Sequence, residues 1–100
     1  MTESFTTISK EQIDFFITNL YREEKSPSTI EKYRRDAFAF YNYLADEKIV
    51  SKEVVQNWKA ELLEQGYKIT SINSMIAAVN SFLDFIGASY CRVKQFKCQR

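Results

Sequence analysis

Several residue types are scarce in this chain of 100 residues, which has no histidine, one proline, two glycines and two cysteines. Without histidine, the side chain that most often acts as a general base near neutral pH is missing, so no Ser-His or Cys-His pair can form. Gly66 and Gly87 stand alone, which excludes a glycine-rich phosphate loop. Few turn residues and 45% hydrophobic residues argue against disorder and against a turn-rich β-protein. A single helical domain is predicted.

Membrane, metal and secretion signals are also missing. No apolar run approaches the length that spans a bilayer, and residues 1–7 lack the basic and apolar regions of a secretion signal. Cys91 and Cys98 alone do not make a metal site, so we predict two reduced thiols and neither a metal nor another cofactor. These features predict a cytoplasmic protein without a membrane partner.

The acidic residues do not indicate an enzyme. Glu23, Glu24, Asp46 and Glu47 lie in stretches of mixed charge, which are typical of solvated surfaces rather than of an acid/base pair. The chain is therefore predicted to be non-catalytic.

Charge is distributed unevenly along the chain, although the formal net charge is only +1. Residues 1–89 hold 10 of the 14 basic residues and all 13 acidic ones, a formal charge of −3. The remaining basic residues lie in the last eleven positions, without an acidic neighbour: Arg92, Lys94, Lys97 and Arg100. Any contact with a polyanion must therefore come from local clusters and from this tail.

Four amphipathic helices are predicted from apolar residues that recur every three or four positions. The four helices are expected to begin after N-caps at Ser9, Ser26, Ser51 and Thr70. They are expected to end at about Glu24, near Asp46, at Gly66 and at Gly87, in that order. Their inward positions are Ile13, Phe16, Ile17, Leu20, Ile30, Tyr33, Ala37, Phe40, Tyr41, Leu44, Val54, Val55, Trp58, Leu62, Ile72, Met75, Ile76, Val79, Phe82, Leu83 and Ile86. The predicted fold is all-α, a compact four-helix bundle.

Two groups of residues are not accounted for by this bundle. Beyond Gly87 the periodicity fades, so residues 88–100 are interpreted as a linker or as the beginning of something longer. Val93 and Phe96 have no evident core to join within the chain and are expected to contact a partner surface or a following domain. The many aromatic residues indicate a ring-rich core rather than a stacking platform for single strands. Phe38, Tyr43 and Phe85 are less well explained and could contact a partner domain.

Two polar clusters are the candidate binding sites, and each begins a helix. The first is S-P-S-T-I-E-K-Y-R-R, from Ser26 to Arg35, and the second is G-Y-K-I-T-S-I-N-S, from Gly66 to Ser74. Free backbone N–H groups, hydroxyls and cations at a helix start are suited to DNA phosphates. Alternatively, these residues only cap helices and face solvent. Two such starts in one small bundle, followed by a basic tail, favour DNA contact.

The ordered pattern resembles the core-binding, SAM-like domain of tyrosine recombinases of the phage-integrase and Xer-like type. The resemblance runs from about Ser9 to Ile86 and includes S-x-x-T-x-x-x-Y-R-x-D, beginning at Ser26. It implies that residues 1–89 form a helical core-DNA-binding domain and that residues 90–100 form a basic linker to a C-terminal catalytic domain absent from this sequence. One departure is that the middle of the fourth helix carries Ala77, Ala78, Asn80 and Ser81, where the family commonly has Arg or Lys.

The resemblance also implies a function and partners. The domain would grip the core recombination half-site of double-stranded DNA, alongside the catalytic domain of the same polypeptide and other protomers of a synaptic complex. The implied DNA contacts are Ser28, Thr29, Lys32, Tyr33, Arg35, Lys68, Thr70, Ser71 and Asn73, together with Arg92 and Lys94 of the tail. Both helix starts would then lie side by side on one cationic surface. The alternative is a small helical protein-interaction module without DNA binding.

Overall fold

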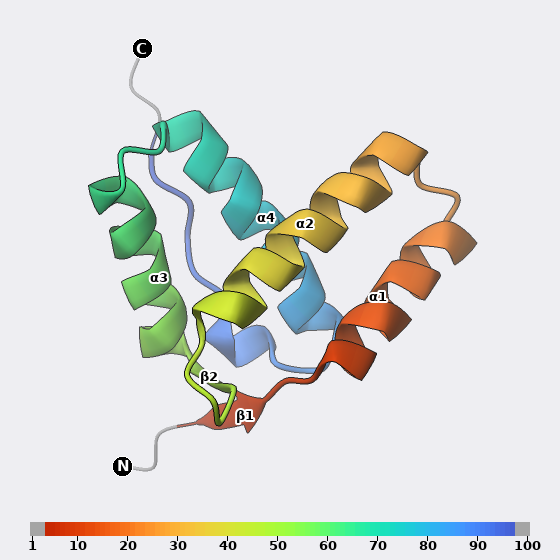
Figure 1. Ribbon diagram of the computed structural model, residues 1–100, viewed down its shortest axis with the longest axis horizontal. Coiled ribbons are helices and arrows are strands. Elements are labelled where there is room, and N and C mark those ends of the chain that lie inside the picture. The colour runs from red at the N-terminus through yellow and green to blue at the C-terminus, as the bar shows by residue number, and fades with distance from the viewer. Residues whose placement is uncertain (1–3, 98–100) are drawn as a thin grey trace.

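Four α-helices form the body of the computed structural model, which describes residues 4–97. The elements in chain order are β1 (Phe5–Thr7), α1 (Lys10–Arg22), α2 (Pro27–Tyr43), β2 (Ile49–Ser51), α3 (Lys52–Glu64), α4 (Ile69–Phe85) and a 3-10 helix, η1 (Ser89–Cys91). Figure 1 shows α2 crossing in front of α4, with α1 on one side and α3 on the other. The predicted all-α, four-helix fold is confirmed.

Three of the four predicted N-caps are confirmed. The side chains of Ser9, Ser26 and Ser51 each accept a backbone N–H from the first turn of their helix, and Ser9 forms a reciprocal capping box with Gln12. The prediction for Thr70 is wrong. The Ile72 N–H bonds to the Lys68 carbonyl at 2.9 Å, so α4 begins at Ile69 and has no side-chain cap.

The helix ends follow from identifiable contacts. Gly66 after α3 and Gly87 after α4 adopt left-handed conformations, with φ of 90° and 80°, and stop their helices as predicted. Helix α2 ends at Tyr43 rather than near Asp46. The Nζ of Lys48 donates to the carbonyls of Tyr41 at 3.0 Å and Leu44 at 3.3 Å, so it satisfies groups that a longer helix would have bonded.

A small antiparallel sheet joins the N-terminal residues to the entrance of α3. Strand β1 pairs with β2 in a register that places Phe5 opposite Ser51 and Thr7 opposite Ile49. The sequence does not indicate this sheet, because three residues per strand are too few for an alternating pattern to stand out.

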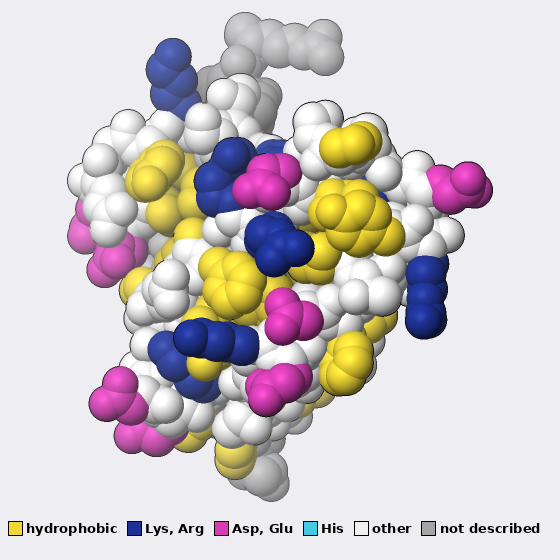
Figure 2. Space-filling view, turned by 45° about the vertical axis from the view of Figure 1, so that its right-hand side comes forward, with side chains coloured by type: hydrophobic (Ala, Val, Ile, Leu, Met, Phe, Trp, Pro, Cys, Tyr) yellow, Lys and Arg dark blue, Asp and Glu magenta, His cyan; other side chains and the backbone are white. Residues whose placement is uncertain are grey.

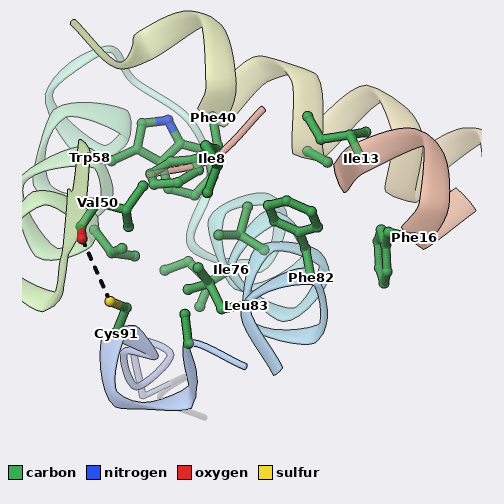
Figure 3. Close-up of a cluster of buried hydrophobic side chains, with 14 of the residues drawn as sticks. Ile8, Ile13, Phe16, Phe40, Val50, Trp58, Ile76, Phe82, Leu83 and Cys91 are labelled. Carbon is green, nitrogen blue, oxygen red and sulfur yellow. Dashed lines mark hydrogen bonds between the residues drawn. The ribbon is translucent and has the colours of Figure 1, made fainter. Parts of the chain in front are cut away.

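The core lies where the inner faces of the helices meet (Figure 3). Phe40 of α2 meets Trp58 of α3 with ring centroids 5.0 Å apart, and Phe16 of α1 meets Phe82 of α4 at 5.5 Å. All predicted inward residues are buried except five that are partly buried at the edge of the core: Tyr33, Tyr41, Val54, Met75 and Ile86. Phe38 and Tyr43 also pack against this edge, whereas Phe85 is 40% exposed.

The segment of residues 92–96, here called the C-terminal strap, packs against α4. Val93 is buried and Phe96 packs on the core, so the expectation that both lack a core within the chain is wrong. The Asn80 amide donates to the Val93 carbonyl at 2.8 Å and accepts the Val93 N–H at 3.2 Å. Asn73 makes the same pair of bonds with Phe96, at 2.9 and 2.7 Å. The strap has no periodicity, so only these long-range bonds reveal its position.

Replacing Asn80 with alanine is expected to loosen the strap. The Val93 N–H would lose its acceptor, so its hydrogen exchange should speed up about two- to tenfold, the effect of a hydrogen bond worth about 0.5–1.5 kcal/mol. Exchange measured by NMR on the variant and on Asn42→Ala, a change at an exposed position of α2, tests this. Equal Val93 exchange rates in the two variants would contradict the assignment.

Cys91 carries a free thiol within the core, where its Sγ lies 3.9 Å from the Val50 carbonyl oxygen. Burial raises the pKa of this thiol above its ordinary value, which keeps it protonated at neutral pH. Cys98 and Arg100, which were included in the sequence predictions, lie outside the described residues. Within residues 4–97, no helix is long and apolar enough to cross a membrane, and no cluster of three or more His, Cys, Asp or Glu side chains could hold a metal.

Candidate nucleic-acid interface

A groove of about 320 Å³ lies between α2 and the first turns of α4. Its walls combine polar side chains from both helices with a tyrosine that precedes α4, and the lining residues are Lys32, Arg35, Asp36, Ala39, Tyr67, Ser71, Ser74 and Met75. Three of the predicted DNA contacts are thus brought together: Lys32 and Arg35 of α2 with Ser71 of α4, which is distant from them in sequence. We call this the α2–α4 groove.

Lys32 bonds to other residues of the protein within this groove. Its Nζ forms an ion pair and hydrogen bond with the Asp36 carboxylate, and it also donates to the Ser74 carbonyl at 3.0 Å. The Asp36 side chain is only 6% exposed, so it needs this cation to offset the cost of burying a charge. Lys32 therefore joins α2 to α4, and Arg35 is the exposed cation among the groove residues.

The residues at the very start of α2 lie away from the groove. Thr29 accepts a hydrogen bond of 2.9 Å from the Ser26 hydroxyl, and exposed Ser28 lies 3.3 Å from the same oxygen. The Tyr33 ring stacks on Phe16 of α1, with centroids 6.2 Å apart and planes inclined by 20°. In Figure 1 the starts of α2 and α4 occupy opposite ends of the upper edge. The expectation that they lie side by side is wrong, since the helices converge further along α2.

The predicted cluster at the start of α4 is divided between two faces of the helix. Lys68 and Thr70 are exposed at the helix start, and Ser71 lines the α2–α4 groove. Asn73 bonds to the strap instead. At 100° per residue, positions 71 and 73 lie nearly opposite each other around a helix.

The two predicted tail residues lie on the strap side of α4. Arg92 and Lys94 are both exposed, and Arg92 forms an ion pair with Asp84 at 3.3 Å. They are thus separated from the α2–α4 groove by the width of α4, rather than extending the same surface.

The charge pattern is mixed on the face shown in Figure 2. Lys and Arg side chains are interspersed with Asp and Glu side chains and with exposed hydrophobic ones. The face shown is therefore not the single cationic surface that the sequence predicted. Any contact with DNA here has to depend on individual cations and hydroxyls rather than on bulk attraction.

Three polar residues of the groove are absent from the implied DNA contacts: Asp36, Tyr67 and Ser74. Tyr67 and Ser74 do fall within the second polar cluster of the sequence. The four-residue spacing of Lys32 and Asp36 is a readable signal, because such a pair faces the same side of a helix. Tyr67 had no comparable signal, since its position depends on how the loop before α4 meets α2.

The helix order and the α2–α4 groove define a small four-helix domain with a polar groove between two of its helices. The chain belongs to the family described as phage integrase, N-terminal SAM-like domain, whose model matches residues 4–88. This confirms the resemblance that the sequence motifs indicated.

Two curated relatives are similar to parts of this chain. It is 32% identical over 81 residues to tyrosine recombinase XerD of Rickettsia bellii (strain RML369-C), which covers 76% of this chain and 27% of that protein. It is also 32% identical over 65 residues to tyrosine recombinase XerD of Rickettsia conorii (strain ATCC VR-613 / Malish 7), covering 61% and 21%. The chain thus spans about a quarter of the length of these relatives. No solved structure matches it.

Proposed function

We propose that this chain is the DNA-binding domain of a site-specific tyrosine recombinase and grips a core recombination half-site in duplex DNA. The observation that carries the proposal is the convergence of Arg35 with Ser71 and Ser74 in one groove, in a chain of this family. An exposed guanidinium supplies charge and several N–H donors to a phosphate, and neighbouring hydroxyls add neutral hydrogen bonds.

Residues around the groove extend the proposed contact surface. Lys68 and Thr70 are exposed at the start of α4, where unpaired backbone N–H groups also attract anions. Lys32 would contribute mainly by holding the two helices in register. The mixed charge of Figure 2 fits weak binding by this domain alone.

This chain would be one domain of a longer, cytoplasmic protein in which binding and catalysis lie in separate domains. This domain would be non-catalytic and would position a catalytic domain of the same polypeptide, with other protomers joining in a synaptic complex. The chain has no histidine to supply the usual general base, which fits a positioning role.

A salt titration of the Arg35→Ala variant tests the proposal. The variant should bind a duplex of about 20 base pairs more weakly, and its slope of log affinity against log salt should flatten by about 0.9 for the lost phosphate contact. Fluorescence anisotropy measures both quantities. Lys10→Ala, an equal charge change at the start of α1, should alter the slope less.

Two outcomes would count against DNA binding through this groove. Equal slopes for Arg35→Ala and Lys10→Ala would remove the groove from the contact surface. If the unaltered domain bound no duplex and instead bound a protein with little dependence on salt, the alternative of a helical protein-interaction module would be favoured.

A further inference from the structure

A second hollow, of about 420 Å³, lies between α3 and the C-terminal strap. Four of its seven lining side chains are cationic and none is acidic: Lys52, Gln56, Lys59, Ser89, Arg92, Val93 and Lys94. This concentration of charge is unusual for the chain, whose first 89 residues carry a formal charge of −3. The resemblance to the recombinase family implied DNA contact for Arg92 and Lys94. It implied none for Lys52 and Lys59, which lie in α3.

The hollow exists because the strap is held in place. Asn73 and Asn80 each bond twice to strap backbone, and Lys59 donates to the Lys94 carbonyl at 2.6 Å. The Lys59 Nζ also lies 4.2 Å from the centre of the Phe96 ring. Cations on a fixed segment lose less conformational entropy on binding a ligand than cations on a free linker.

Nearby acids reduce this positive charge only in part. Asp84 pairs with Arg92 and accepts a 2.6 Å hydrogen bond from Ser89, at the border of the hollow. Lys52 and Lys94 are exposed, and no ion pair to either is found among the described residues. Donors therefore dominate the site, a chemistry suited to phosphate oxygens.

We infer that this hollow is a second phosphate-binding site, which takes a stretch of nucleic-acid backbone different from the one in the α2–α4 groove. The two sites lie on different sides of α4. Ser71 and Ser74 face α2, whereas Asn73 and Asn80 hold the strap, whose Arg92, Val93 and Lys94 line the hollow. A duplex is stiff, with a persistence length of about 150 base pairs, so one segment does not bend around the helix to reach both sites. The choice of nucleic acid as the source of the phosphates rests on the proposed function.

NMR titration with inorganic tripolyphosphate tests the site itself. Saturable shifts are expected at backbone amides of residues 52–59 and 92–96, and Lys52→Ala with Lys94→Ala should weaken binding about tenfold. Asn80→Ala removes no charge, yet it should also weaken binding because the strap loosens. The matched controls are Lys10→Ala with Lys25→Ala for charge and Asn42→Ala for the amide. Shifts spread over all lysines, or equal effects of test and control variants, would overturn the inference.

A bridging assay tests the source of the phosphates. Protein saturated with an immobilised duplex should capture a labelled second duplex, and the Lys52→Ala, Lys94→Ala variant should lose this capture while keeping its first duplex. Arg35→Ala should instead weaken binding of the first duplex and leave the NMR shifts caused by tripolyphosphate unchanged. The two variants therefore distinguish an error in the proposed groove contact from an error in the proposed hollow. Capture of an acidic peptide such as polyglutamate in preference to the duplex would overturn the nucleic-acid assignment.

Discussion

Replacing Phe40 with alanine is expected to produce the largest loss of stability of any change considered. The ring is completely buried and connects α2 to α3 through its edge contact with Trp58. Truncating such a ring typically costs about 3–5 kcal/mol, through lost burial and the cavity that remains. In domains of this size each 1 kcal/mol lowers Tm by about 4–8 °C, so a drop of more than about 12 °C should follow.

Thermal unfolding followed by circular dichroism measures the effect. Phe15→Ala is the matched control, because it removes the same atoms from a ring that is 65% exposed on α1 and should change stability by no more than about 0.5 kcal/mol. Similar melting temperatures for the two variants would show that the contact between Phe40 and Trp58 does not hold α3 in place.

Replacing Lys32 with methionine is expected to have the second largest effect. The Asp36 carboxylate would stay buried without its cation, and the Ser74 carbonyl would lose a donor. Breaking a fully buried ion pair costs about 3–5 kcal/mol, and the 30% exposure of Lys32 reduces this to about 2 kcal/mol. Chemical denaturation of Lys32→Met, with Lys25→Met as the control at an exposed position, measures the loss.

A double variant separates this structural role from general charge loss. Lys32→Met with Asp36→Leu removes both charges and leaves apolar side chains between α2 and α4, so it should be more stable than Lys32→Met alone. If the double variant instead lost as much unfolding free energy as Lys32→Met and Asp36→Leu together, the ion pair between Lys32 and Asp36 would be contradicted. Because replacing Lys32 also disturbs the packing of α2 on α4, Arg35 is the better position at which to test DNA contact.

The positions of the helices and of their buried faces could be predicted, because both depend on residues that lie within a few positions of one another in the sequence. The caps at Ser9, Ser26 and Ser51 are local hydrogen bonds, and the apolar stripe that contains Ile13, Phe16, Ile17 and Leu20 repeats with the helical period. The cap at Thr70 failed for an equally local reason, since Lys68 already starts the helix.

The candidate site was predicted less completely. Residue type marked Lys32, Arg35 and Ser71 as polar candidates, and the fold places all three beside one groove. Which of them is exposed depends on Asp36, whose burial follows from the packing of α2 on α4. Asn73 has the chemistry of a base contact, but its amide bonds to the backbone of Phe96, 23 residues away.

By itself, the sequence determined the helical class, the residues that form the core and the family to which the chain belongs, because periodicity and local motifs are written in consecutive residues. Only the tertiary structure decided how the polar residues are shared between two sides of α4. That division arises from contacts between distant segments: Lys32 with Ser74, Lys59 with Lys94, and two asparagines with the strap. Such contacts depend on how whole helices pack, which no short stretch of sequence specifies.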